Sequence, residues 1–386
     1  MVLQKVVETA PADERVVEAV LTAAQTLGSA GDRRMVLLAL LDRRNPGPAA
    51  LVRLVQATEG MTSPGDTRAV LTRVAQAADD PRVLAAVVQA ATRIGPEGER
   101  RQVLLAVLEG TRPDAETALQ TLKAVEGMSA AGEKRMVLLK VLERAPAEPR
   151  VLGAVIRTAA TIGPDGECRQ VLLAVLEKKD PGVETLLEIV KAAEKLGSSG
   201  EKRMVLLKVA EVAPAEDRVL GALVEAAATI GSEGDRRQVL LAVLGKKKLG
   251  KETLLQVVKT AAGMGAAGER RMVLLKVAQA APADERVLEA LVEAARTIPS
   301  EGERGQVLTG VLHKEGLRGS TAIRVLETAA AMHSDDQKAR VLLEVPESHL
   351  RDQAVAAAYT EAAHTLRSGD RYKQVMSVVF EKRGQR

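Results

Sequence analysis

Arg237-Gln-Val-Leu-Leu-Ala-Val-Leu244 is the stretch that decides the fold of this 386-residue chain, because the same octapeptide also starts at Arg101 and Arg169. The spacing between successive copies is constant. A related heptapeptide, Arg-Met-Val-Leu-Leu-Lys-Val, alternates with it. Its copies start at Arg135, Arg203 and Arg271. Two alternating units of about 34 residues, a Gln-type and a Met-type, therefore form a longer period of about 68 residues.

The residue four places before each Gln or Met is taken as the anchor of its unit, and this spacing extends over most of the chain. The anchors are Gly31, Gly65, Gly98, Gly132, Gly166, Gly200, Gly234, Gly268, Gly302, Asp336 and Asp370. Their spacing predicts an all-α fold: a right-handed α-solenoid of about eleven two-helix 34-residue repeats, alternating as 68-residue pairs. We expect one solenoid over residues 1–386, with a partial N-terminal repeat at 1–11 and an atypical C-terminal capping repeat at 346–386.

Each unit has the pattern of two helices. In the first helix, typified by residues 284–298, Val287, Leu288 and Leu291 recur at three- and four-residue steps. A glycine follows this helix in several units and predicts a left-handed helix end. These glycines are Gly28, Gly95, Gly163, Gly197 and Gly231. The second helix begins with a serine followed three residues later by Asp, Glu or Gln, which predicts a capping box. These serines are Ser29, Ser63, Ser198, Ser232, Ser300 and Ser334.

Composition restricts the classes of protein to which the chain can belong. Apolar residues make up 46% but aromatics only 1%, so the core is predicted to consist of Leu, Val, Ala and Ile. The single cysteine, Cys168, excludes a disulfide within the chain. Neither a signal peptide nor an apolar run of about 18 residues is present. We expect a soluble protein, with a cytoplasmic location favoured and a periplasmic one open if the chain is part of a larger protein. Because residues 1–16 align on 272–287, the chain is either a fragment or begins with a capping helix.

An arginine three places after most anchors forms the most regular charged feature, which we call the arginine ladder. It comprises Arg34, Arg68, Arg101, Arg135, Arg169, Arg203, Arg237 and Arg271. Stacked helices would place these side chains about 8–10 Å apart. One interpretation is a basic ladder for a polyanion or an acidic peptide. The favoured interpretation is structural, because acidic residues stand just before most of these arginines and can pair with arginines of adjacent units.

Other candidate residues give no catalytic, cofactor or metal site. The segment Gly245–Glu252 imitates a phosphate-binding loop, but Glu252 replaces the required hydroxyl and the segment follows a helix, so it is interpreted as a lysine-rich turn. The four histidines lack pairs at metal-ligand spacing, and Cys168 has no partnered base. They are His313, His333, His349 and His364.

All three aromatic residues, Tyr359, Tyr372 and Phe380, lie in the last 28 residues. Terminal units of solenoids are expected to be atypical, because no further repeat covers them. The favoured interpretation is a C-terminal cap, and the alternative is a patch at which a partner docks.

The unit resembles HEAT-type helical pairs, whereas the aromatic signature positions of tetratricopeptide repeats are lacking. The segments Ile230–Leu240 and Ser334–Leu342 are also similar to units in the helical tails of bacterial antibiotic-sensor-type membrane metallopeptidases. The zinc-binding motif of the protease part is absent. This resemblance implies an interaction tail without protease activity, in the periplasm or the cytoplasm.

These observations favour a non-enzymatic scaffold that presents an extended repeat surface to a protein or peptide. Neither the identity of the partner nor the oligomeric state follows from the sequence. One alternative is polyanion or nucleic-acid binding through the arginine ladder, although the ladder contains no aromatics on which bases could stack. A second alternative, suggested by the nearly identical middle units, is a consensus-like or engineered scaffold without a natural ligand.

Overall fold

The computed structural model describes residues 2–9, 14–44, 46–110 and 113–383, and the side chains of all of these except 43–44 and 378–383. Over these ranges the chain forms 24 helices and no strand. This confirms the all-α, tandem-repeat α-solenoid. The helices group into two compact units, Met1–Lys195 and Leu196–Arg386, each of which is described by itself. The expected single array over 1–386 and its handedness stay predictions.

The first unit alternates first and second helices. Its first helices are α2 (Glu14–Gln25), α4 (Pro48–Gln56), α6 (Pro81–Ala91), α8 (Ala115–Glu126), α10 (Pro149–Ala159) and α12 (Val183–Glu194). Its second helices are α1 (Val2–Thr9), α3 (Ala30–Arg44), α5 (Pro64–Ala77), α7 (Glu97–Glu109), α9 (Ala131–Arg144) and α11 (Asp165–Leu176). Helix α1 belongs to the predicted partial repeat, whose residues 10 and 11 lie outside the described residues.

The second unit repeats this order. Its first helices are α14 (Asp217–Ala228), α16 (Lys251–Ala262), α18 (Glu285–Arg296), α20 (Gly319–Ala330) and α23 (Gln353–His364). Its second helices are α13 (Ser199–Val212), α15 (Glu233–Leu244), α17 (Ala267–Ala280), α19 (Glu301–Leu312), α21 (Asp335–Leu343) and α24 (Gly369–Arg383). A short extra helix, α22 (Glu347–Leu350), precedes α23 and makes the last repeat irregular.

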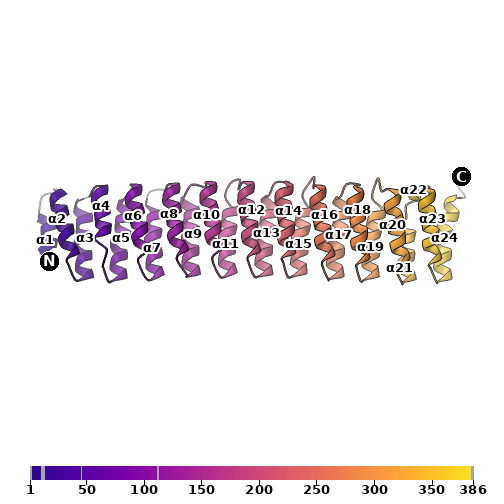
Figure 1. Ribbon diagram of the computed structural model, residues 1–386, viewed down its shortest axis with the longest axis horizontal. Helices are drawn as coiled ribbons and strands as arrows, with labels where there is room; N and C mark the ends of the chain where they lie inside the picture. Colours follow the sequence, from indigo (N-terminus) through magenta and orange to yellow (C-terminus); the bar gives the residue numbers. More distant parts are fainter. Residues whose placement is uncertain (1, 10–13, 45, 111–112, 384–386) are drawn as a thin grey trace. The chain divides into compact units, whose positions relative to one another are not determined.

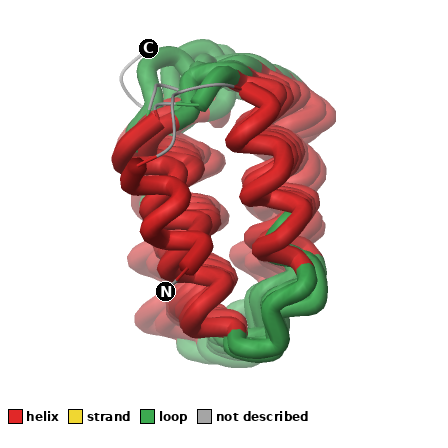
Figure 2. The backbone as a smooth tube through the Cα atoms, turned by 90° about the vertical axis from the view of Figure 1, so that its left-hand side faces the viewer, coloured by secondary structure: helices red, strands yellow, loops and turns green. Residues whose placement is uncertain are grey.

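Within each unit the helices form two layers (Figures 1 and 2). Second helices pack on one another in chain order, as α5, α7 and α9 do in the first unit and α13, α15 and α17 do in the second. First helices pack in the same way, as in the series α14, α16 and α18. Each repeat therefore contacts its neighbours along the chain, which is the arrangement of a repeat array.

The core is aliphatic, and its centre is the Val-Leu pair that the recurring peptides share. In six consecutive repeats both side chains of this pair are fully buried. The pairs are Val103–Leu104, Val137–Leu138, Val171–Leu172, Val205–Leu206, Val239–Leu240 and Val273–Leu274. Burial of one such side chain contributes about 1.5–3 kcal/mol. The recurrence of this pair is therefore a packing requirement that each repeat meets in turn.

One of the two hydrogen bonds of the predicted capping boxes is confirmed, the one in which the serine hydroxyl accepts from a backbone N–H three residues later. The Ser63 hydroxyl accepts from the Asp66 N–H at 3.4 Å, and Ser232 accepts from the Asp235 N–H at 3.3 Å. The acidic side chains differ from the prediction, because they turn toward the preceding repeat instead of reaching back. Asp66 Oδ1 lies 2.6 Å from Arg34 Nη1. The third residue of these helices therefore links two repeats.

The prediction of left-handed ends for the first helices is wrong. Among the described glycines only Gly60 and Gly316 have a positive φ, so none of the five glycines predicted to end these helices is left-handed. The helices end instead in tight right-handed turns, as in the bond from the Ile230 N–H to the Ala227 carbonyl at 3.0 Å. Basic side chains donate to the last carbonyls, so a glycine in the left-handed region is not needed.

The turns that follow three of the second helices do contain a left-handed residue. Asp180, Lys248 and Gly316 occupy equivalent positions in successive pairs of repeats, with φ of 50°, 60° and 75°. Only glycine adopts this conformation without steric strain. A Cβ on Gly316 would also lie 3.3 Å from the Ala283 Cβ.

We expect Gly316→Ala to lower the free energy of unfolding by about 1–2 kcal/mol, because the left-handed backbone would then carry a Cβ. The measurement is urea denaturation of the full chain followed by circular dichroism. Gly132→Ala is the control, because no atom lies within 4 Å of its Cβ position and its φ is not positive. The control should leave the midpoint unchanged or raise it slightly, and a loss equal to that of Gly316→Ala would contradict the strain argument.

Candidate functional site

The arginine ladder lies on the second helices, where its side chains pair with carboxylates of the following repeat. Arg101 Nη1 lies 2.8 Å from Glu133 Oε2, and Arg135 Nε lies 2.9 Å from Glu167 Oε2. The remaining pairs are Arg34–Asp66, Arg68–Glu99, Arg203–Asp235, Arg237–Glu269 and Arg271–Glu303. Arg169, at the end of the first unit, also has an interaction. The arginines are partly exposed, so each pair contributes about 0–1 kcal/mol.

The Gln and Met that distinguish the two types of repeat receive a second contact from the same arginines. Arg135 Nη1 donates to Gln170 Oε1 at 2.8 Å, and Arg237 Nη1 donates to Met272 Sδ at 3.3 Å. These ladder arginines thus contact both an acid and a Gln or Met of the next repeat. The role of the ladder in binding a partner stays a prediction, and its geometry is that of a link between repeats.

A second row of cations, one residue before the ladder, is buried and was missed at the level of sequence. Arg33, Lys134, Lys202, Arg270 and Lys338 are 5–8% exposed. Doublets such as Lys202-Arg203 contain the signal, but only the helical phase decides which of the two basic residues points inward. We call this set the buried cation row.

Members of the buried cation row donate to the carboxyl end of the first helix of the next repeat. Arg270 Nη1 donates to the Thr297 carbonyl at 2.9 Å, and Lys338 Nζ donates to the Thr365 carbonyl at 3.0 Å. In Gln-type repeats the equivalent cation turns back to its own first helix, as Arg236 does to the Ile230 carbonyl at 2.6 Å. A cation at a helix carboxyl end is favoured by the helix dipole. Arg270 also contacts its own repeat, because its Nε donates to the Met264 carbonyl at 2.8 Å. The contact with the next repeat is therefore what distinguishes the Met-type cation and gives the longer period a physical basis.

We expect Arg270→Met to lower the free energy of unfolding by about 2 kcal/mol, because buried carbonyls would lose a charged donor. Arg271→Met removes the adjacent ladder arginine and is the matched control, with an expected loss of about 0–1 kcal/mol. Urea denaturation of both variants measures the difference. Equal losses would show that the buried cation has no larger role than the exposed one.

Carboxylates at the start of several second helices form a further link. Glu233 accepts from the Gly265 and Ala266 N–H groups at 2.6 Å each. Glu97, Glu301 and Asp335 accept from two backbone N–H groups of the following repeat in the same way. The backbone hydrogen bonds lower the pKa of Glu233. Desolvation acts in the opposite direction on the pKa of Glu97 and of Glu301, but the hydrogen bonds outweigh it and both values are lowered.

A carboxylate whose pKa is lower in the folded state than in the unfolded chain stabilises the fold at any pH above the unfolded pKa, which is 4.5 for Glu. This contribution is lost as the pH falls through the folded-state pKa. Glu233→Gln should therefore be less stable than the parent at pH 7, and the difference in stability should shrink as the pH falls below about 5. Thermal melts across this range provide the measurement. Glu361→Gln, at an exposed site in α23, is the control and should show no such convergence.

Cys168 and the histidines show no arrangement for chemistry. Cys168 occupies a slot of the buried cation row, and burial, followed by the charge of Asp165, raises the pKa of its thiol to about 11. A thiol with so high a pKa is a poor nucleophile at neutral pH. His313 and His333 lie beside Glu344 and Glu301, on the surface. Within the described residues, no group of three His, Cys, Asp or Glu side chains could hold a metal ion.

The three aromatics differ in their surroundings. Tyr359 is fully buried, its hydroxyl donates to the Val375 carbonyl at 3.1 Å, and burial raises its pKa to about 12. Tyr372 is half-buried, with its ring centroid 5.6 Å from that of His364. Phe380 belongs to α24, but its side chain lies outside the described residues. The choice between a cap and a docking patch stays a prediction, and the buried Tyr359 has the contacts of a core residue.

The outer face of the second helices carries exposed apolar side chains. Met35, Met136, Met204 and Met272 are 39–40% exposed. One turn further along the same face are half-buried leucines, present in both types of repeat. The row comprises Met35, Leu38, Leu105, Met136, Leu139 and Leu173 in the first unit, and Met204, Leu207, Leu241, Met272 and Leu275 in the second. We call it the Met–Leu row.

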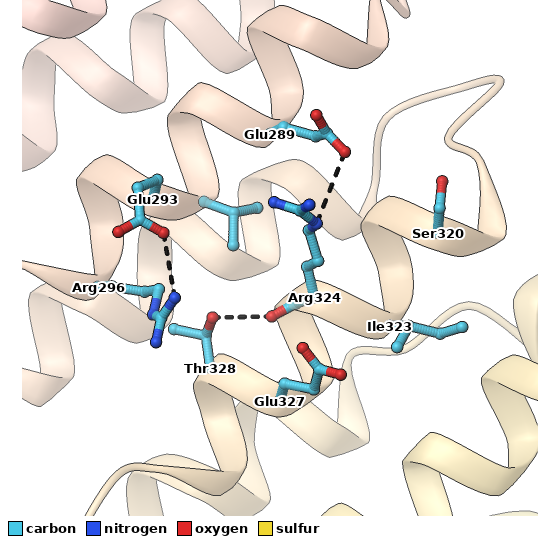
Figure 3. Close-up of a pocket in the computed structure, with 9 residues that line it drawn as sticks. Glu289, Glu293, Arg296, Ser320, Ile323, Arg324, Glu327 and Thr328 are labelled. Atoms are coloured by element: carbon cyan, nitrogen blue, oxygen red, sulfur yellow. Dashed lines mark hydrogen bonds and ion pairs between the residues drawn. The ribbon is translucent and has the colours of Figure 1, made fainter.

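A cavity of about 560 Å³ lies between the first helices α18 and α20 (Figure 3). Two of its three carboxylates are close to arginines: Arg324 Nε lies 3.6 Å from Glu289 Oε1, and Arg296 Nη1 lies 3.1 Å from Glu293 Oε2. The Glu289 position is occupied by Gly153 and Gly221 in the equivalent repeats. The equivalent ion pair in the first unit is that of Glu18 and Arg53, so the charges of this cavity are not confined to one place in the chain.

The segment that imitates a phosphate-binding loop is a turn between α15 and α16, as predicted. Gly250 is the N-cap of α16, and its N–H donates to Asp217 Oδ1 at 3.2 Å. Lys251 Nζ lies 3.0 Å from Asp284 Oδ2. The helix start that a phosphate would need is thus occupied by a carboxylate of the same chain.

The protein belongs by architecture to the helical-repeat solenoids. No family model and no curated protein matches the chain. Among solved structures it is similar to a circular tandem repeat protein with novel repeat topology and enhanced subunit contact surfaces, at 16% identity over 98% of this chain and 81% of that chain, with a TM-score of 0.19.

Two other structures show a similar degree of likeness. A TPR domain shares 14% identity over 91% of this chain and 98% of its own, with a TM-score of 0.20. A computationally designed self-assembling cyclic homo-oligomer shares 10% identity over the same fractions, with a TM-score of 0.12. These are tandem-repeat and designed scaffolds, and scores of this size transfer no function. In the described part of the chain, no helix has the length and apolar character needed to cross a bilayer.

Proposed function

We propose that the protein is a non-enzymatic scaffold that binds protein or peptide partners along the Met–Leu row of each unit. The observation that carries this proposal is the recurrence of exposed methionines at equivalent positions, while the aliphatic side chains on the inner face of the same helices are fully buried. Exposed apolar side chains that recur in a row are typical of interaction surfaces. Methionine is suited to such a role because its flexible side chain adapts to irregular partners.

The links between repeats support this function indirectly. Within each unit the ladder pairs link successive second helices, so that the Met–Leu row of that unit has less conformational freedom to lose on binding. A partner that contacts several repeats would gain from this preorganisation. The ladder itself is less suited to a polyanion, because a polyanion would have to compete with the seven carboxylates already paired with these arginines.

The test uses peptides selected from a random library on the full chain, with dissociation constants measured by fluorescence polarisation. Met136→Glu/Met204→Glu/Met272→Glu should weaken binding at least about tenfold, or about 1.4 kcal/mol, because charges would replace the apolar contacts. Gln56→Glu/Gln89→Glu/Gln120→Glu adds the same charge on the first helices and is the matched control.

The control should bind within about twofold of the parent. If both triple variants bind equally well, the Met–Leu row is not the binding surface. Retention on heparin at low salt that disappears steeply with added salt would favour the polyanion alternative instead.

A further inference from the structure

A cavity of about 600 Å³ beside the turn between α15 and α16 is lined by four lysines and no acidic residue. The lysines are Lys246, Lys247, Lys248 and Lys276. Lys246 has a structural role, because its Nζ donates to the Glu211 and Ala213 carbonyls at 3.1 and 2.8 Å. Lys247 and Lys248 are exposed and Lys276 is half-buried. Within the described residues no carboxylate pairs with these three, and we call the site the lysine cavity.

Comparison with equivalent repeats shows that the lack of acids is specific to this place. Lys140 lies 3.4 Å from Glu109 and 3.0 Å from Glu143, and Lys208 lies 2.9 Å from Glu211. At the equivalent positions around Lys276 the chain has Gly245 and Gln279. Both acidic partners are therefore replaced at once.

The turn itself has changed in the same direction. Asp180 of the earlier turn is replaced by Lys248, which adopts a left-handed backbone although the next equivalent residue is Gly316. A lysine is disfavoured in the left-handed conformation, so the stability of the turn does not explain why this position is a lysine. All three substitutions add positive charge or remove negative charge around one cavity.

A second hollow continues the lysine cavity across the end of α17. Apolar side chains line much of it, and His313, Lys314 and Glu315 also line it. The hollow has a volume of about 550 Å³ and shares Gln279, Ala281 and Pro282 with the lysine cavity. Its apolar wall includes Leu275, the last residue of the Met–Leu row, and Gly310. The equivalents of Gly310 are alanines, and a Cβ at Gly310 would lie 3.0 Å from Leu275 Cδ2. The glycine therefore keeps the hollow open.

We propose that this groove binds a partner segment in which several acidic residues are followed by a bulky apolar side chain. The inference rests on the proposed function and specifies the chemistry of the partner. The acidic residues would lie over the lysine cavity, whose charge no carboxylate of the described residues neutralises, and the apolar side chain would enter the hollow beside Gly310. An extended peptide fits the two joined cavities, whereas a small anion would use only the charged one.

The experiment measures binding of a fluorescein-labelled peptide of eight alternating Glu and Asp residues followed by two leucines to the full chain. Lys247→Gln/Lys248→Gln/Lys276→Gln should weaken binding at least about tenfold and reduce its salt dependence. Lys178→Gln/Lys179→Gln/Lys208→Gln removes the same charge around the equivalent turn, where Lys178 is used because the position equivalent to Lys248 is Asp180. This variant should bind within about twofold of the parent. Gly310→Ala should weaken the leucine-bearing peptide but not a version with serines in place of the leucines.

Several outcomes would overturn the proposal. These are no binding at about 1 mM peptide, equal losses in the two lysine variants, or equal affinity for the leucine and serine peptides. Tripolyphosphate that binds as tightly as the peptide would point to a simple anion site instead. If library peptides still bind the Met–Leu row while the acidic peptide does not, only this inference fails. If neither binds, the proposed function fails as well.

Discussion

The capping of first-helix carboxyl ends by cations from the second helices is the interaction on which the regularity of this protein depends. A first helix in a two-layer array ends close to the neighbouring repeat, where its last carbonyls need donors. Arg270 and Lys338 supply them from the preceding repeat, and Arg236 supplies them from its own. Once the carbonyls are satisfied in this way, the Val-Leu pairs of successive second helices can pack at a constant spacing.

Much of the fold could be predicted from the sequence, because the signals are periodic and local. The recurring peptides set the repeat length, and Ser63 and Ser232 mark helix starts through bonds to residues three positions away. The ends of the first helices could not be predicted as reliably, because a glycine such as Gly231 is only a local signal, whereas the decisive donor, Arg236, lies in the next helix. The buried cation row was missed for a similar reason. In a doublet such as Arg270-Arg271 the burial of each residue depends on helix phase and on the neighbouring repeat.

Some of the candidate sites recur along the chain, and others depend on residues that differ between equivalent repeats. The ladder recurs in most repeats and its arginines pair with carboxylates of the same chain. Its geometry therefore fits a link between repeats better than a binding site for a ligand. The Met–Leu row also recurs but is left exposed. The lysine cavity has its own set of residues, because the acids of the equivalent repeats are replaced there by Gly245, Lys248 and Gln279. A sequence comparison among repeats can find such departures, but only the structure shows that they line a common hollow.

Because the buried cations donate to carbonyls of the following repeat, the order of repeat types restricts how the chain can gain or lose repeats. A Met-type repeat sends its cation to a threonine-bearing helix end that the following Gln-type repeat provides, as at Thr229 and Thr297. Loss or duplication of a single repeat would place two repeats of one type side by side and leave a donor or a carbonyl without its match. Gain or loss of a whole Gln-type and Met-type pair preserves every junction. This pairing holds from Gly98 onward. A single repeat, with Ala69 at the Gln or Met position and Thr67 at the cation position, stands between the Met-type repeat at Gly31 and the Gln-type repeat at Gly98, so the alternation is broken there. Changes in length by whole pairs are therefore expected in the regular part of the array.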